Sequence, residues 1–365
     1  MSKKIIKAKE TMTSRERVVK TFAYEKTDRV PINYFTNPTI HGKVASALGL
    51  SNNYEGFMQA IGVDYRGIGA GYRGPLIFKE IPGLNVDPVY GFYTKWIENE
   101  YGGYHDFCNF PLADADDEEI AQFMFPSADD FDCENIENSI KHYNDYALFC
   151  GGAGVGDIIN SIGRIMGMED TLVGIYSENE AVLGLIDRKL NMELKLMERV
   201  LEKGKGRIDF LWLGEDLGTQ HTPMISLELY RKVFRPRHQR FVDLAKSYNI
   251  PVMIHTCGSS SWVYEDLIEM GISAVDTLQP EAANMSPEYL TEHFGKRLSF
   301  HGCISTAGVL AYGTEQETID CCKRTLELMM KNGGYHFAPT HSIQDNTPVE
   351  NVIAMYQAAH TYGVY

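Results

Sequence analysis

Long apolar runs are missing from this sequence of 365 residues. No stretch approaches the roughly 20 consecutive apolar residues that a membrane-spanning helix requires. Residues 1–7 (MSKKIIK) are basic, but they lack the apolar core of a signal peptide. We therefore predict a cytoplasmic protein that does not insert into a membrane.

Positive charge is scarce as well, because 34 Lys and Arg stand against 49 Asp and Glu, a formal net charge of -15. This excess of negative charge argues against binding to nucleic acid or to an anionic membrane surface. The cysteines are odd in number, 7, and scattered along the chain. They do not form the paired framework of a small secreted domain, and those near histidines are candidates for metal binding or catalysis.

Nucleotide-binding signatures are also missing. No G-x-G-x-x-G follows a first strand, and no Walker A sequence occurs. Residues 151–156 (GGAGVG) are rich in glycine, but they lack the lysine and the spacing of a phosphate-binding loop. We interpret them as a loop whose backbone approaches a neighbouring segment closely.

The sequence does contain a regular alternation of strand and helix patterns after a tail of about 12 residues that we expect to be frayed. Apolar segments rich in β-formers recur at residues 30–35, 62–66, 146–150, 208–214, 251–258, 272–278, 298–303 and 334–339. A segment at about 70–130, first rich in glycine, proline and aromatic residues and then acidic, interrupts this alternation. The pattern predicts a single α/β domain over residues 1–365, a (β/α)8 TIM barrel with an N-terminal extension and a β-rich insertion.

Candidate site residues follow the expected strands, where a barrel of this kind places its active site. His255 and Cys257 end the segment 251–258 two residues apart, so their side chains point the same way and could bind one zinc ion. The alternative is a buried histidine beside a buried free cysteine. Several other metal-capable or polar residues follow strands, which favours zinc: Glu215, Asp216, Gln279, Cys303 and His341.

The third metal ligand is open between several residues. We favour His341, because it ends the last strand, which lies next to the first strand in a closed barrel. Cys303 and Glu215 are the alternatives for a third or fourth position. A catalytic zinc keeps one position open, so three protein ligands suffice. Glu215 or Asp216 could hold or protonate a substrate, and Gln279 could orient it.

Motifs along nearly the whole chain resemble the uroporphyrinogen decarboxylase superfamily. They are RERV at 15–18, DRVP at 28–31, GEDLGTQ at 214–220, H-x-C-G at 255–258, FHGCIS at 300–305, GGY at 333–335 and NTPVEN at 346–351. The resemblance implies a barrel and a cytoplasmic enzyme. Decarboxylases of this superfamily bind a polycarboxylate with arginines soon after the first strand, whereas residues 36–40 here (TNPTI) contain none.

The resemblance therefore favours the corrinoid-dependent methyltransferase branch, in which a His-x-Cys pair and a later cysteine bind zinc. His255 and Cys257 match the pair, and His341 stands where the later cysteine falls. We predict a zinc-dependent methyltransferase that moves a methyl group between a small substrate (a methoxy compound, as in O-demethylation, a methylamine or a thiol) and a corrinoid carried by a partner protein. The alternatives are a carboxy-lyase that uses Asp64, Arg66 and Asp216 without a metal, and a non-catalytic corrinoid- or metallophore-binding module. The oligomeric state stays open, a homodimer included.

Overall fold

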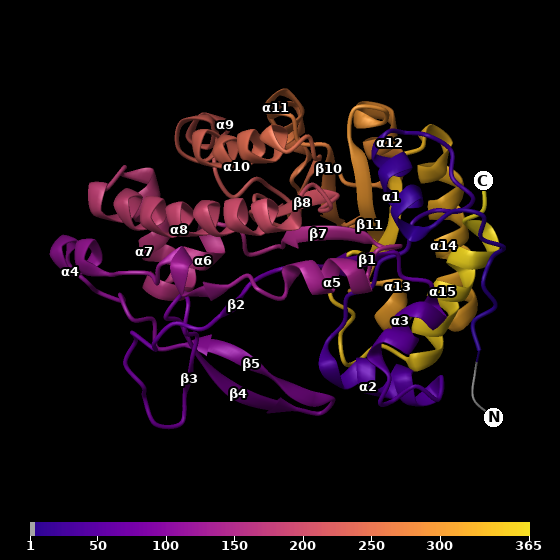
Figure 1. The fold of residues 1–365 in the computed structure, drawn as a ribbon, viewed down its shortest axis with the longest axis horizontal. Helices are drawn as coiled ribbons and strands as arrows, with labels where there is room; N and C mark the ends of the chain where they lie inside the picture. Colours follow the sequence, from indigo (N-terminus) through magenta and orange to yellow (C-terminus); the bar gives the residue numbers. More distant parts are fainter. Residues whose placement is uncertain (1–3) are drawn as a thin grey trace.

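The computed structural model describes residues 4–365, and its centre is a curled parallel sheet (Figure 1). Its seven strands lie in the order β1-β7-β8-β9-β10-β11-β12, all parallel to their neighbours. Their bounds are β1 Tyr65–Gly67, β7 Ala147–Gly151, β8 Phe210–Gly214, β9 Val252–His255, β10 Ala274–Leu278, β11 Ser299–Ile304 and β12 Tyr335–Pro339. Strands β8, β10, β11 and β12 are buried along their whole length, as expected for a parallel sheet covered on both faces.

The strand predicted at 30–35 is not a regular strand, and this part of the prediction is wrong. Pro31 has no N–H to donate, and Ile32 N donates to the Asp64 carboxylate (2.8 Å) instead of to a neighbouring carbonyl. The segment keeps isolated contacts on both sides, because Asn33 N donates to Phe337 O (2.9 Å) and Asp64 N donates to Ile32 O (2.9 Å). The regular curled sheet of residues 4–365 therefore has seven strands, where eight were expected.

Helices follow the strands and cover the outer side of the sheet (Figure 1). Helix α14 shows why they pack there, since Thr318, Cys322, Leu326 and Met329 are buried at helical spacing while the opposite face is charged. The main helices are α1 Ser14–Phe22, α2 Pro38–Ala47, α3 Tyr54–Ile61, α5 Ile136–His142, α6 Ile159–Met166, α7 Met168–Tyr176, α8 Glu180–Gly204, α9 Leu227–Leu229, α10 Arg235–Ser247, α11 Tyr264–Met270, α12 Pro287–Phe294, α13 Val309–Tyr312, α14 Glu315–Met329 and α15 Val349–Tyr362. Within residues 4–365, no helix is long and apolar enough to cross a bilayer.

The predicted β-rich insertion forms antiparallel strands, and Figure 1 shows its hairpin lying apart from the main sheet. Its elements are β2 Gly71–Tyr72, β3 Asn85–Val86, β4 Tyr93–Asn99, β5 Gly102–Cys108, α4 Asp117–Gln122 and β6 Phe131–Asp132. The hairpin tip shares a surface pocket with Asn37 and with residues 344–346, which follow β12. The insertion therefore reaches the carboxyl-terminal end of the sheet.

Apolar side chains on the inner face of the curled sheet form their own buried cluster. It contains Tyr65, Ala147, Phe210, Trp212, Met253 and Ala274, together with Val18 from helix α1. Strand residues two apart share a face, so Phe210 and Trp212 point inward while Leu211 and Leu213 pack in the outer core. Helix α1 begins with a capping box, in which the side chains of Thr13 and Glu16 each accept from the other's backbone N–H.

The predicted frayed tail is also wrong for the residues that the structure describes. Ile6 N donates to Gln357 Oε1 (2.8 Å), and Glu10 pairs with Arg29 (2.7 Å). The first contact holds the segment against helix α15. The second joins it to Arg29, which also pairs with the buried Asp64. Residues 1–3 lie outside the described part of the chain.

Candidate metal centre and pocket

Strand β9 delivers His255 and Cys257 to one point at its carboxyl end. The distance from His255 Nε2 to Cys257 Sγ is 3.4 Å. His341, two residues past the end of β12, completes the group, and the ligand atoms of the three residues lie within 4.8 Å of one another. No other such group of three is found among residues 4–365. The three favoured ligands therefore converge, and we refer to His255, Cys257 and His341 as the metal group.

The donor atoms fit a zinc ion. Tetrahedral zinc with Zn–N near 2.1 Å and Zn–S near 2.3 Å places neighbouring ligand atoms about 3.5 Å apart. The His255–Cys257 separation of 3.4 Å matches this value. All three ligand atoms lie within 4.8 Å of one another, and His341 is the exposed member of the group, so its side chain has room to adjust. One thiolate and two imidazoles are also donors that zinc prefers.

A buried hydrogen-bond chain orients His255. Asn33 Nδ2 is a donor and lies 3.1 Å from His301 Nε2, so that nitrogen accepts and His301 Nδ1–H donates to Asp276 Oδ1 (2.6 Å). The other oxygen, Asp276 Oδ2, accepts from His255 Nδ1–H at 2.9 Å. With Nδ1 engaged by Asp276, Nε2 is the nitrogen of His255 that faces Cys257 and is available to a metal ion, the arrangement typical of metal-binding histidines.

Strand β10 is irregular where it supplies Asp276. Its register with β11 shifts between Val275 and Leu278, and Thr277 has a φ of 65°, a rare conformation for a β-branched residue. The irregularity brings Thr277 Oγ1 to 2.6 Å from His255 Nδ1. Bulges often re-aim side chains beside active sites in this way.

Replacing Asp276 with asparagine is expected to weaken zinc binding by about 10- to 100-fold, the usual effect of losing a carboxylate that orients a metal-binding histidine. The amide retains the volume but offers one acceptor for two histidine N–H groups. Competition for zinc with a chromophoric chelator measures the change, and Asp243→Asn, on the exposed face of α10, is the matched control. Equal affinity in the two variants would contradict the orienting role.

Asp216 lies at the edge of the metal group. Its Oδ1 accepts from Cys257 N (2.8 Å) and lies 3.9 Å from His255 Nε2, and its Oδ2 accepts from Asn160 (2.7 Å). Burial alone would raise the pKa of Asp216, but His255 and the Cys257 N–H hold it below the ordinary value. Gln279 Oε1 accepts from Gly258 N (2.6 Å). Both residues thus hold the turn that carries Cys257.

Glu215 does not face the metal group. Its side chain is fully buried and accepts from Ile158 N (2.8 Å) and Ile159 N (3.0 Å) at the start of helix α6. Burial and the neighbouring Asp157 raise the pKa of Glu215 well above its ordinary value. The structure therefore places Glu215 as a cap of helix α6, away from the ligands it was predicted to join.

The raised pKa of Glu215 gives a pH-dependent prediction for stability. In the unfolded chain Glu215 ionises above pH about 4.3, while the folded protein keeps it protonated to a higher pH. The wild type therefore loses stability as the pH rises from the unfolded pKa of Glu215 toward its folded pKa. Glu215→Gln removes this loss. Relative to the wild type, its free energy of unfolding should rise by at least about 1 kcal/mol from pH 4 to pH 8 in urea titrations. Exposed Glu228→Gln is the control, and a constant difference at both pH values would refute the shift.

Cys303 is not part of the metal group. It belongs to β11 with a φ of 71°, is 1% exposed and packs in the outer apolar core. Burial and the neighbouring Cys321 raise the pKa of its thiol. The structure thus brings together His255, Cys257 and His341, and leaves Cys303 and Glu215 outside the group.

A pocket of about 280 Å³ opens beside His255 and His341. Its apolar wall consists of Phe35, Phe149 and Trp212, and hydroxyl groups come from Thr277, Thr340 and Ser342. The glycine-rich loop also lines it, and it approaches β8 closely as predicted. Gly151 has a φ of 88°, and a Cβ there would lie 2.1 Å from the Trp212 carbonyl oxygen.

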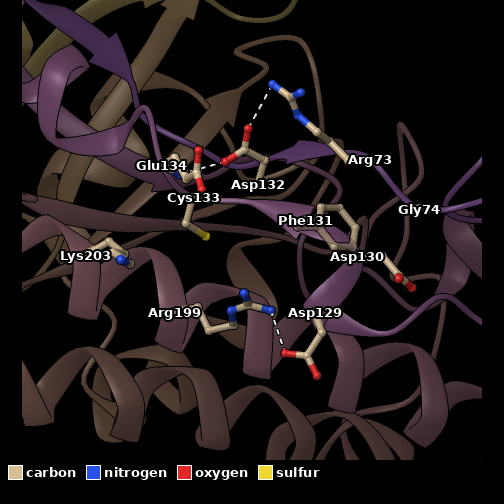
Figure 2. A pocket seen from close by; sticks show the side chains of 10 residues that line it. All are labelled: Arg73, Gly74, Asp129, Asp130, Phe131, Asp132, Cys133, Glu134, Arg199 and Lys203. Carbon is tan, nitrogen blue, oxygen red and sulfur yellow. Dashed lines mark hydrogen bonds and ion pairs between the residues drawn. The ribbon is translucent and has the colours of Figure 1, made fainter.

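A larger pocket of about 620 Å³ lies between the insertion and helix α8 (Figure 2). Both of its arginines are in ion pairs, since Arg73 lies 2.8 Å from Asp132 and Arg199 lies 2.8 Å from Asp129. None of the three metal-group residues lines it. Because its arginines are already paired and its lining lacks the candidate ligands, we do not place the active site there.

Sequence reasoning missed Asp276 and His301. Both lie inside strands that are otherwise apolar, β10 (AVDTL) and β11 (SFHGCI). An ionisable residue within a buried strand needs a polar partner. Its presence in an apolar segment of the sequence could therefore have indicated a buried polar contact. Identifying the partner required knowing which strands are neighbours.

The comparison with solved structures shows this fold in a methyltransferase. A methyltransferase from Methanosarcina mazei is 16% identical over 95% of this chain and 98% of its own, with a TM-score of 0.62. Xylanase 10B from Thermotoga maritima is 12% identical over the same shares, with a TM-score of 0.45. No curated protein sequence matches the chain.

A family comparison goes further than these structural likenesses. The model of the family described as uroporphyrinogen decarboxylase (URO-D) matches residues 161–362. The matched region runs from helix α6 to the end of α15 and contains all three residues of the metal group. Since this is more than half of the sequence, the chain belongs to the uroporphyrinogen decarboxylase family.

Proposed function

We propose that this protein is a zinc-dependent methyltransferase that moves a methyl group between a small substrate and a corrinoid carried by a partner protein. The observation that carries the proposal is the convergence of His255, Cys257 and His341 beside a pocket at the carboxyl ends of the strands. Family membership and the fold shared with a methyltransferase from Methanosarcina mazei support a methyltransferase-like role.

The residues of this site would have two roles, holding zinc and fixing the geometry of the residues that hold it. His255, Cys257 and His341 would hold zinc, and Asp276 keeps His255 in the tautomer that can bind it. Asp216 and Gln279 fix the backbone on either side of Cys257, at Cys257 N and Gly258 N. Bound zinc would supply Lewis acidity, which polarises a methyl donor or lowers the pKa of a thiol.

His341 favours a methyl ether as donor over a thiol as acceptor. A neutral imidazole in place of a thiolate gives the ligand set one negative charge less. Zinc held by this set would therefore be a stronger Lewis acid, and a thiolate bound to it would be less nucleophilic. In the favoured direction the C–O bond breaks with its electron pair left on oxygen, which takes up a proton. The methyl group bonds to cobalt(I) of the corrinoid, which supplies the electron pair.

The pocket gives no support to the carboxy-lyase alternative. Asp64 lies just before β1, at the opposite end of the sheet from the metal group, and it is paired with Arg17 (2.6 Å) and Arg29 (2.7 Å). Arg66 pairs with Glu55 (2.7 Å). No arginine or lysine among residues 4–365 lines the 280 Å³ pocket, so a polycarboxylate would find none of the guanidinium or ammonium groups that it needs. The cytoplasmic location and the homodimer stay predictions.

Methyl transfer to free cob(I)alamin tests the proposal. Zinc-loaded and chelator-treated protein are each mixed with reduced cobalamin and with methoxybenzene, trimethylamine or methanethiol, and methylcobalamin is followed by its absorbance. We expect formation only with zinc, fastest with methoxybenzene, and none with His255→Ala. His293→Ala, on the exposed side of α12, is the control. Equal rates in zinc-free protein, or no transfer from any donor, would overturn the proposal.

A further inference from the structure

Three aromatic rings form the apolar wall of the metal-site pocket, and each comes from a different segment. Phe35 follows the irregular first segment, Phe149 lies on β7 and Trp212 lies on β8. Trp212 is 3% exposed and packs edge-on against Phe35 (centroids 5.5 Å) and Phe149 (5.0 Å). Both phenylalanines are partly exposed, so all three rings border a space of about 280 Å³.

The stability of the fold does not explain why residue 212 is a tryptophan. Its indole N–H is buried and has no acceptor in the described part of the chain. A buried donor without a partner destabilises a fold, and phenylalanine at this position would avoid that cost. We therefore attribute Trp212 to the wide, flat surface that its indole ring offers to a ligand in the pocket.

The charges around the pocket disfavour a charged substrate. No lysine or arginine of residues 4–365 lines it, so a carboxylate or phosphate has no guanidinium or ammonium partner there. Asp276 is the acidic residue of the lining, and its oxygens already accept from His255 and His301. A quaternary ammonium could contact the aromatic rings, but two histidines already share that carboxylate and the proposed zinc ion beside it would repel a cation. What remains for a ligand is aromatic surface and a few hydroxyl groups.

We propose that the methyl donor is an uncharged aryl methyl ether with a single ring. The ring lies among Phe35, Phe149 and Trp212, and the ether oxygen points toward His255 and His341. Aromatic rings gain from offset or edge-on contacts with one another, which a saturated ring does not provide. The cavity, about 280 Å³, is at the small end of ligand pockets, which limits the donor to one ring. The assignment rests on the proposed methyl transfer for the identity of the reacting group.

Binding measurements without turnover test the assignment on the zinc-loaded full chain. Calorimetric titrations compare methoxybenzene with methoxycyclohexane, which has the same methoxy group on a saturated ring, and with phenyltrimethylammonium. We expect methoxybenzene to bind about two- to tenfold more tightly than either. Trp212→Leu should abolish this preference and Trp212→Phe should retain part of it. Trp96→Leu, on the exposed strand β4, is the matched control and should retain all of it.

A second measurement keeps the assignment testable if Trp212→Leu does not fold. In the wild type, NMR cross-relaxation between the ring protons of methoxybenzene and the indole protons of Trp212 is expected. Equal binding of methoxycyclohexane, tighter binding of the cation, or contacts to Trp96 alone would overturn the assignment. Methyl transfer without any ring preference would refute only the aryl ether, and ring preference without methyl transfer would refute the proposed function.

Discussion

Zinc affinity is expected to fall by more than about 100-fold when His255 is replaced by alanine or Cys257 by serine. Losing a residue that only orients a ligand already costs about 10- to 100-fold, and these two residues would bind the metal directly. Serine keeps the size of cysteine but offers a hydroxyl that is not deprotonated at neutral pH. The two variants should show similar losses, since each leaves two of the three donors.

Competition with a chromophoric chelator at fixed pH measures these affinities. Cys303→Ser is the informative control, because Cys303 was an alternative third ligand in the sequence and lies in the apolar core in the structure. Its replacement should leave zinc affinity unchanged, and so should Cys321→Ser on helix α14. A loss in Cys303→Ser as large as in Cys257→Ser would show that the ligand set differs from the one proposed.

Asp64→Ala is expected to lower the free energy of unfolding by about 3–5 kcal/mol, the usual cost of removing one partner from a buried ion pair. Asp64 is fully buried and accepts from Arg17 (2.6 Å), Arg29 (2.7 Å), Ser14 Oγ (2.6 Å) and Ile32 N (2.8 Å). Its removal leaves two guanidinium groups buried beside a cavity. Burial alone would raise the pKa of Asp64, but the two arginines hold it below the ordinary value, so the network stabilises the fold at neutral pH and weakens in acid.

Urea unfolding at pH 7 measures this change. Glu178→Ala, which breaks an exposed pair with Lys232, is the control and should change stability by less than about 1 kcal/mol. The folded fraction of Asp64→Ala should bind zinc normally, because Asp64 lies at the opposite end of the sheet from His255. Unchanged stability with lost activity would instead favour a catalytic Asp64, as the carboxy-lyase alternative requires.

Local pattern was enough for the positions of seven strands, for the insertion and for the convergence of His255 and Cys257. The β-α alternation predicted seven strands that the structure contains, and two-residue spacing at a strand end predicted that His255 and Cys257 converge. It failed at residues 30–35, where Pro31 has no N–H and Ile32 N donates to the Asp64 carboxylate, so that only isolated backbone contacts form. The contact that decided this segment comes from a residue more than 30 positions away.

The sequence by itself determined which residues stand at the carboxyl ends of the strands, because the periods of strands and helices are local properties of the chain. Only the tertiary structure decided which way each side chain faces. Glu215 and Asp216 are adjacent, yet Glu215 caps helix α6 and Asp216 holds the turn at Cys257. Asp276 reaches His255 and His301 because β10 lies between β9 and β11. Such facing depends on the twist, register and neighbours of the strands, and these are set by packing among segments distant in the chain.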